Sequence, residues 1–289
     1  MKILVIGSGF LATQIVKRLE AEGNKLLVFS RSRNVRIEAE QIVGDIFDFH
    51  NFVKVLDWEP QAVIHTAWIT TPKIYKNHPS NLEYANFTSR LAHSLLGSKV
   101  EHFIVLGTCA EYLQELNPSL QGVNNSTATT LYAEQKIQAF ESVSRILGNS
   151  EIRFTWARIF FPYGPGQHSL RLIPTLLSSL KGGETVCLTD TSSIYDWITT
   201  RDVSSAISWI LRHQLTSQVD VGTSIGYTNL EILMTLEGLL GISHKKTVGK
   251  IHELGLNQTL LASKESSLFS SGWIPKDTLV AGLAWVLDS

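Results

Sequence analysis

Residues 2–12 read KILVIGSGFLA, an apolar run that passes directly into a glycine-rich turn and then into residues suited to a helix. A strand before the spacing Gly7-x-Gly9-x-x-Ala12 and a helix after it are the context that a dinucleotide-binding turn requires. Gly7 permits the tight turn, Gly9 lets the backbone approach a pyrophosphate, and Ala12 lets the helix pack on the strand. The stretch therefore predicts a βαβ unit that binds a dinucleotide at a helix N-terminus; a glycine-rich turn without a ligand is the alternative.

Short apolar runs recur along the first half of the chain, with amphipathic stretches between them. The predicted strands cover residues 2–6, 25–29, 62–65, 102–106 and 152–157, and the clearest helical patterns cover residues 10–22, 81–96 and 133–147. This alternation predicts an α/β fold of the Rossmann type, built on a doubly wound parallel sheet.

The pattern of the sequence changes near Pro162. The chain reads PYGPGQ there, and shorter predicted elements begin to alternate with turns. We expect a dinucleotide-binding domain at residues 1–161 and a smaller, mainly substrate-binding region at residues 162–289. The two should interleave, because residues 191–222 contain apolar runs that could return to the first domain. Residues 124–130 are polar and without periodicity, which predicts a loop.

Composition restricts the partners and the compartment. The 289 residues are 44% hydrophobic, and a chain of this length buries roughly 75% of its unfolded surface, so it needs no metal or disulfide to hold a core. With 25 basic and 26 acidic residues and no run of like charge, neither a nucleic acid nor a membrane is an expected partner. Cys109 and Cys187 lack metal-ligand spacing, which argues against a zinc site. With no signal-peptide pattern and no spanning apolar stretch, a cytoplasmic protein is expected.

The residues after the second predicted strand bear on the choice of dinucleotide. NAD sites usually place an acid there to bind the ribose 2′-hydroxyl, whereas this chain reads FSRSR from residue 29. Arg31, with Ser30 and Arg33, can hold a 2′-phosphate, which favours NADP over NAD; a solvated basic loop is the alternative. Asp45 follows the third predicted strand, either to meet the adenine amine or as part of a surface turn.

Tyr132 and Lys136 lie four residues apart in a predicted helix, which places them on one face. Lowering a phenol pKa from about 10 by about three units requires about 4 kcal/mol of differential stabilisation, which a neighbouring ammonium and an oxidised nicotinamide could supply. Thr108 follows an apolar strand, at the sheet edge that faces the ligand crevice. A helix-surface pair and a turn-capping threonine are the alternatives, but the combination indicates a site for carbonyl–alcohol chemistry.

Together these residues resemble the extended short-chain dehydrogenase/reductase family, which contains nucleotide-sugar epimerases, dehydratases and 4-keto reductases. The likeness runs over nearly the whole chain. It rests on the GSGFLA turn, Gly44-Asp45, residues 63–67, Asn86, Thr108 with Tyr112, the Tyr132/Lys136 pair, Arg158, residues 163–166, and Asp196 with residues 201–203.

The resemblance implies a role for each catalytic candidate. Tyr132 would be the proton donor or acceptor, and Lys136 would bind the nicotinamide ribose and lower the pKa of Tyr132. Thr108 would orient the substrate oxygen, and Asn86 would be a scaffold behind Lys136. His65 also falls on a family position, and we interpret it as structural. The predicted cofactor contacts are completed by Ser8, Phe10, Leu11, Ile46, Thr66, Ala67 and Phe160.

Two departures from the family pattern reduce the number of activities that the chain is expected to have. The family's dehydratases carry an acidic pair directly after the Ser/Thr, and here those positions are Cys109 and Ala110, which disfavours dehydration. Glu111 is displaced by one residue and, by strand-like alternation, is expected to point elsewhere.

Further departures concern the substrate. Where many relatives carry Asn and Arg to bind a nucleotide diphosphate, this chain has Phe161 and Tyr195. Arg158, His168 or Arg171 could compensate, since an anion in a cleft favours arginine, although a helix-face or turn role is the alternative for each. Substrate contacts are expected from Thr108, Cys109, Phe161, Arg171 and Tyr195.

The expected function is an NADP-dependent reductase, with NAD as the alternative cofactor, that acts on a keto group of a nucleotide-activated deoxysugar. Tyr132 would serve as general acid. An NAD-dependent nucleotide-sugar 4-epimerase and a non-catalytic dinucleotide sensor are the alternatives. The resemblance also implies a homodimer formed through residues 81–96 and 133–147, although the apolar residues of both helices could equally all face the sheet.

Overall fold

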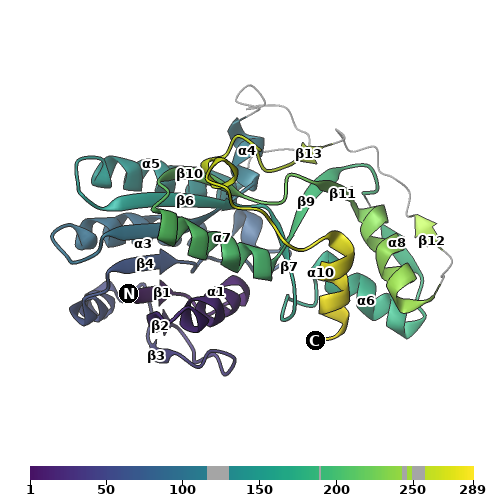
Figure 1. Cartoon of the computed structure of the whole chain (residues 1–289), viewed down its shortest axis with the longest axis horizontal. Coiled ribbons are helices and arrows are strands. Elements are labelled where there is room, and N and C mark those ends of the chain that lie inside the picture. Colours follow the sequence, from purple (N-terminus) through teal and green to yellow (C-terminus); the bar gives the residue numbers. More distant parts are fainter. Residues whose placement is uncertain (116–129, 189, 243–245, 249–257) are drawn as a thin grey trace.

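Seven parallel strands form the central sheet of the protein (Figure 1). The computed structural model describes residues 1–115, 130–188, 190–242, 246–248 and 258–289, so almost all of the loop predicted at residues 124–130 lies outside the described residues. The strands are β1 (Lys2–Ile6), β2 (Lys25–Ser30), β3 (Glu40–Val43), β4 (Ala62–His65), β5 (His102–Thr108), β6 (Arg153–Ile159) and β10 (Ser217–Val221), in the spatial order β10-β6-β5-β4-β1-β2-β3. This order confirms the doubly wound Rossmann-type sheet, with its topological switch between β1 and β4.

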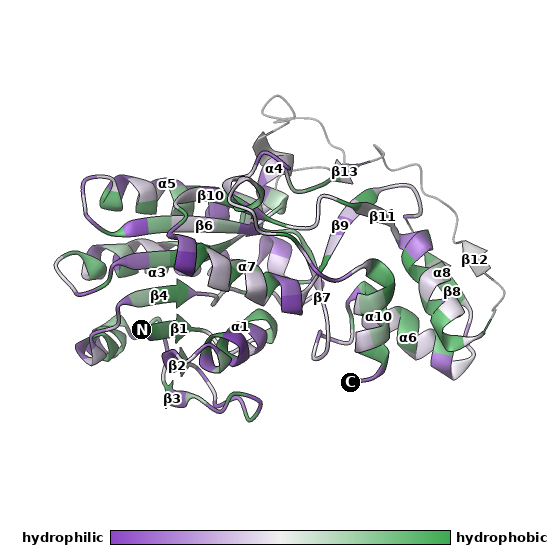
Figure 2. Ribbon diagram, viewed as in Figure 1, coloured by the Kyte–Doolittle hydropathy of each residue, from purple (hydrophilic) through white to green (hydrophobic). Residues whose placement is uncertain are grey.

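Helices cover both faces of this sheet, which explains why its strands read as continuous apolar runs. Ile3 and Val5 of β1 pack under one layer, and Leu4 and Ile6 pack under the other, because successive residues of a strand point to opposite faces. The first layer contains α1 (Phe10–Ala21), α7 (Thr200–His213) and the short α9 (Ser267–Ser270), and the second contains α3 (Ser80–Leu95) and α5 (Leu131–Leu147). Figure 2 shows the apolar character of β1 and β4 in green.

Shorter helical segments connect these elements. They are α2 (Phe49–Phe52), η1 (Val53–Trp58), η2 (Tyr75–Asn77) and α4 (Ala110–Glu115). The predicted helices agree with α1, α3 and α5 to within two residues at each end.

A second lobe with its own apolar core lies at one end of the molecule (Figure 1). Strand β9 (Ile194–Thr199) pairs with β7 (Phe161–Tyr163), β11 (Gly226–Thr228) and β13 (Thr259–Leu260), and β8 (Val186–Leu188) pairs with β12 (Lys246–Val248). Helices α6 (Leu172–Gly182), α8 (Asn229–Leu240) and α10 (Leu279–Leu287) supply the rest of the lobe.

The chain crosses between the two lobes several times. Only the later part of residues 191–222 returns to the large sheet. Strand β9 pairs within the sheet of the second lobe, whereas α7 packs on the large sheet and β10 is one of its strands. Leu268 and Trp273 then join the core of the first lobe again before α10 enters the second. Among the described residues, no helix combines the length and the apolar character that a membrane span needs.

Candidate active site

The glycine turn after β1 has the geometry of a dinucleotide cradle. Gly7 has φ +107°, and a Cβ there would lie 2.4 Å from Thr66 Oγ1, so a larger residue would be strained. A Cβ on Gly9 would meet no described atom within 4 Å, so this side of the turn is open. Gly9 caps α1 with no side-chain hydrogen bond from the described residues, which leaves the first N–H groups of the helix available to an anion. These residues fit a bound dinucleotide.

Neighbouring loops hold this turn in place. Thr66 donates from Oγ1 to Ile6 O at 2.9 Å, and the Ala67 N–H donates to the same carbonyl at 3.0 Å. On the other side, Asn34 donates from Nδ2 to Ser8 O at 2.6 Å. The sequence analysis missed Asn34, because a polar residue in the loop after β2 has no pattern that shows its partner.

A cavity of about 800 Å³ opens beside the turn. Its walls come from α1, the loop after β2, the turn after β7 and the end of α10. It includes Ser8 and Gly9 from the predicted cofactor set, and its basic lining residues are Lys17 and Arg36. The cradle thus continues into a crevice between the two lobes.

The end of β2 presents arginine without a nearby acid in the sequence. Arg31 and Arg33 are exposed, whereas Ser30 is buried and donates its hydroxyl to Ser32 O at 2.8 Å. Arg31 and Asp45 both lie near the Tyr84 phenol: burial raises the pKa of Tyr84, Arg31 lowers it and Asp45 raises it further. Arg31 and Asp45 therefore both act on Tyr84 at this edge of the sheet, whereas the Ser30 hydroxyl is bonded within its own loop.

Several predicted cofactor residues have a packing role. Asp45 is exposed and accepts the Phe47 N–H at 3.0 Å, which is the turn role considered for it. Ile46 is buried in the core beneath β2, and Phe160 is fully buried with Cys109. Phe10 and Leu11 are half-buried at the start of α1.

Tyr132, on the first turn of α5, lies beside Thr108 at the end of β5, close enough for the Thr108 side chain to act on its phenol. Its half-buried ring lies against Tyr75, with 5.1 Å between the ring centroids. Burial raises the pKa of Tyr132 above the ordinary phenol value, and the Thr108 side chain opposes this. The expected lowering of this pKa is therefore not present in the protein alone, and the phenol is protonated at neutral pH.

Lys136 lies one helical turn further along α5 and is buried. Its Nζ donates to Leu106 O at 2.5 Å and lies 3.8 Å from the centroid of the Trp68 ring. Burial lowers the pKa of Lys136 to about 7, and the Glu111 carboxylate opposes this shift. The ammonium is thus close to losing its charge at neutral pH, and its surroundings decide whether it does.

The expected scaffold role of Asn86 is not supported. Asn86 lies on the exposed side of α3, because the helix turns Asn81, Tyr84 and Thr88 toward the sheet instead. Thr88 Oγ1 lies 3.0 Å from His65 Nε2, and burial together with Lys136 lowers the pKa of His65 to about 3. A neutral, hydrogen-bonded His65 agrees with its structural interpretation.

The strand-like alternation assumed for Glu111 is absent from the structure. Helix α4 begins at Ala110 instead and turns the Glu111 side chain inward. It is fully buried beneath Thr108 and accepts the Thr108 N–H at 2.8 Å. It also forms an ion pair with Arg158 at 2.8 Å and accepts the Trp156 indole N–H at 3.0 Å. Burial raises the pKa of Glu111, and Arg158 opposes this. Arg158 therefore supports the catalytic strand through Glu111.

Aromatic side chains surround the residues predicted to contact the substrate. Phe161 packs on Tyr195, with 4.4 Å between ring centroids, and Tyr195 donates to Asp190 Oδ2 at 2.9 Å. Arg171, at the start of α6, reaches across to the first lobe, where it donates to Thr70 O at 2.9 Å. Its guanidinium carbon also lies 5.1 Å from the Tyr75 ring, which touches Tyr132.

Two further residues were considered for the substrate, Cys109 as a contact and His168 as an anion ligand. Cys109 is buried, and burial raises the pKa of its thiol. His168 is exposed on the turn before α6.

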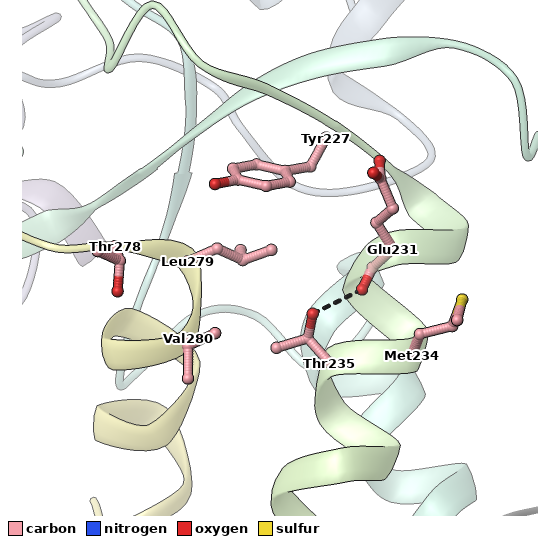
Figure 3. A pocket seen from close by; sticks show the side chains of 7 residues that line it. All are labelled: Tyr227, Glu231, Met234, Thr235, Thr278, Leu279 and Val280. Atoms are coloured by element: carbon pink, nitrogen blue, oxygen red, sulfur yellow. Dashed lines mark hydrogen bonds between the residues drawn. The ribbon is translucent and has the colours of Figure 1, made fainter.

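A second hollow lies in the second lobe, away from the predicted site residues (Figure 3). It measures about 330 Å³ and lies between α8 and the start of α10, where Tyr227, Met234 and Leu279 line it. Within the hollow, Thr235 donates to Glu231 O at 2.8 Å. The predicted catalytic side chains lie instead at and beside the carboxyl end of β5 in the large sheet.

A glycine cradle at the switch point of a Rossmann-type sheet, with a threonine at the end of β5 and a tyrosine and a lysine on helix α5, defines a dinucleotide-dependent enzyme of the short-chain dehydrogenase/reductase kind. The chain belongs to the NAD-dependent epimerase/dehydratase family, whose model matches residues 3–222.

Curated relatives and solved structures agree with this assignment. The chain is 27% identical to a UDP-glucose 4-epimerase of Lactobacillus helveticus, with 96% of the chain and 92% of the relative aligned. It is 24% identical to the dTDP-D-glucose 4,6-dehydratase of Bos taurus over 81% of the chain and 69% of the relative. It shares the fold of the NAD complex of the Thermus thermophilus UDP-glucose 4-epimerase, with a TM-score of 0.83, 21% identity and coverage of 100% and 98% of the two chains.

Proposed function

We propose that the protein is an NAD-dependent nucleotide-sugar 4-epimerase. The observation that carries this proposal is the placement of Tyr132 beside Thr108, one helical turn from Lys136 on α5. Cys109 and Ala110 replace the acidic pair that dehydration needs. Relatives named as UDP-glucose 4-epimerases then favour epimerisation over the reductase expected from the sequence.

The chain's own residues would handle the proton of the reaction. NAD, when bound, supplies a hydride acceptor that can return the hydride to the same carbon. Tyr132, as a phenolate, takes the proton of the sugar 4-hydroxyl and later returns it to the 4-keto oxygen. Thr108 holds that oxygen, and the Lys136 ammonium favours the phenolate. Inversion requires the keto sugar to present its other face before the hydride and the proton return.

Arg171 is the proposed ligand of the substrate diphosphate. Phe161 and Tyr195 occupy the positions of the usual diphosphate ligands and pack on each other, so they offer aromatic faces where the family uses polar groups. Arg171 comes from the second lobe and extends toward Tyr75, beside Tyr132. A guanidinium at this place suits a diphosphate, since its planar N–H groups bind phosphate oxygens in pairs.

The test of the proposed function needs two measurements on the purified full chain. Denaturation should release a nucleotide that mass spectrometry identifies as NAD, and incubation with UDP-galactose should produce UDP-glucose without added cofactor. If cofactor-replete protein does not interconvert any of the common UDP-hexoses, the epimerase proposal is wrong.

An NADP-dependent ketoreductase is the second candidate, favoured by Arg31 at the end of β2 and by Lys17 and Arg36 in the adjoining cavity. Oxidation of NADPH in the presence of a nucleotide 4-keto-6-deoxysugar would support it. Arg31→Ala should then weaken NADPH binding by about 10-fold or more and leave NADH binding unchanged, because it removes a charged hydrogen-bond donor to the 2′-phosphate.

A homodimer formed through α3 and α5, located in the cytoplasm, is part of the proposal. Ser89 of α3 donates to Ser142 of α5 at 2.9 Å, which ties the two helices into one surface. Light scattering of the purified protein measures the oligomeric state directly.

A further inference from the structure

We propose that Trp68 is a positioning residue whose indole face holds the ammonium of Lys136 in place; the catalytic consequence rests on the proposed function. Trp68 follows Ala67 in the loop after β4 and is only 8% exposed. The centroid of its ring lies 3.8 Å from Lys136 Nζ, within the range of a cation–π contact. Its edge also faces the Tyr132 ring, with 6.5 Å between centroids.

Buried hydrogen bonds fix the orientation of this indole. Trp68 donates from Nε1 to Asn81 Oδ1 at 2.8 Å. Asn81 is fully buried, and its Nδ2 donates to Tyr75 O at 2.7 Å and to His78 O at 2.8 Å. The Tyr84 ring stacks on Trp68 at 5.6 Å and 24°. Rotating the indole away from Lys136 would leave buried donors and acceptors unpaired, which is costly.

The contact matters because the ammonium is desolvated. Its hydrogen bond to Leu106 O uses one of three N–H groups, and the Trp68 face covers another side. The titratable groups that interact with Lys136 are Glu111 from α4 and His65 from β4, and Tyr132 lies one turn away on α5 itself. Glu111 and Trp68 favour the charged form, whereas burial disfavours it. Without the indole face, a larger share of Lys136 would be uncharged at neutral pH.

The experiment compares Trp68→Leu with Trp68→Phe in the full chain. Both variants lose the hydrogen bond to Asn81, but only the phenylalanine keeps an aromatic face, so the pair separates the cation–π contact from packing. The pKa of Lys136 is read from the ¹³Cε signal of labelled lysine as a function of pH, and Lys136→Arg identifies that signal. We expect Trp68→Leu to titrate about one pH unit below wild type and Trp68→Phe to lie close to wild type.

The same variants report on catalysis. In Trp68→Leu the pH profile of kcat should shift, with KM for the nucleotide sugar nearly unchanged. Because the NMR titration needs no turnover, it tests the positioning role even if the protein proves not to be an epimerase. If Trp68→Leu does not fold, 5-fluorotryptophan placed at position 68 alone keeps the shape of the indole and weakens its face. The Lys136 titration should again move to lower pH, and the same replacement at Trp156, whose ring centroid lies 5.6 Å from Lys136 Nζ, should move it less. Unchanged titration in the folded variants, or in the fluorinated protein, would overturn the proposal.

Discussion

Tyr132 lies beside Thr108 although the two residues belong to different elements and are separated by 24 positions in the chain. The contact arises because β5 ends at Thr108 at the same sheet edge on which the first turn of α5 lies. In the protein alone, burial raises the pKa of Tyr132, so the phenol is ready to donate a proton. Acceptance of a proton requires positive charge nearby, and Lys136 is the cation on the same helix face.

Tyr132→Phe should lower kcat by about 10²–10⁴-fold, because it removes the group that exchanges a proton with the substrate. The affinity for NAD should stay within a factor of two or so, since the ring and its packing are kept. Steady-state kinetics and calorimetric titration with NAD measure the two effects. Tyr227→Phe, in the hollow of the second lobe, is the matched control and should leave both unchanged; equal activity of the two variants would contradict the assigned role.

Gly7→Ala and Gly9→Val should separate folding from cofactor binding. Gly7→Ala places a Cβ 2.4 Å from Thr66 Oγ1 at φ +107°, so the free energy of unfolding should fall by about 1–3 kcal/mol. Gly9→Val extends into open space, so stability should hold while NAD affinity falls by 10-fold or more, because the backbone can no longer approach the pyrophosphate. Denaturant unfolding and NAD titration of both variants check this. Tight NAD binding by Gly9→Val would show that the dinucleotide lies elsewhere.

Glu111→Gln should destabilise the protein by about 3–5 kcal/mol, because it removes one charge of the buried ion pair between Glu111 and Arg158. Urea unfolding gives the loss. Glu59→Gln breaks an exposed ion pair with Lys99 and should leave the midpoint unchanged, which makes it the control. If Glu111→Gln lost little unfolding free energy, the groups around the pair would have to compensate for the missing charge.

The protein should lose stability as the pH falls below about 6.5. Burial lowers the pKa of His65 to about 3 and that of His102 to about 4, so between those values and 6.5 the unfolded chain binds more protons than the folded one. Each histidine then contributes up to about 1.4 kcal/mol of lost stability per pH unit. Urea unfolding at pH 7, 6 and 5 measures the slope. His102→Gln should flatten it, and the exposed His93→Gln should not.

Arg171→Gln should raise KM for the nucleotide sugar by about 10–100-fold, the value of a lost charged hydrogen bond, and leave NAD affinity unchanged. Arg171→Lys should recover part of the loss, because it restores the charge without the paired N–H geometry. Initial rates over a range of substrate concentrations decide this. An unchanged KM would assign the diphosphate to other residues.

The elements of the large sheet were predictable because their sequence pattern is local. Strands β1 and β4 agree residue for residue with the prediction, since strands covered on both faces form uninterrupted apolar runs. The short strands of the second lobe, such as β8 and β13, escaped prediction because each depends on a partner distant in the chain.

The site was predictable only where a motif fixes its context. The glycine turn and the Tyr132/Lys136 spacing carry their geometry in a few neighbouring residues. Asn34 and Trp68 act through partners that the fold alone brings close, and no sequence pattern marks them. The error at Glu111 has a local cause, because the start of α4 at Ala110 replaced the assumed alternation by a helical turn.

The repeated crossing of the chain between the lobes has a consequence for how such an enzyme can be modified. A fragment ending at residue 161 would lack β10 and α7, which would leave β6 as a bare edge with unpaired N–H and C=O groups, prone to aggregate. The second lobe therefore cannot be exchanged as an independent unit. New specificity has to arise by replacing side chains in place, as the Phe161–Tyr195 stack illustrates.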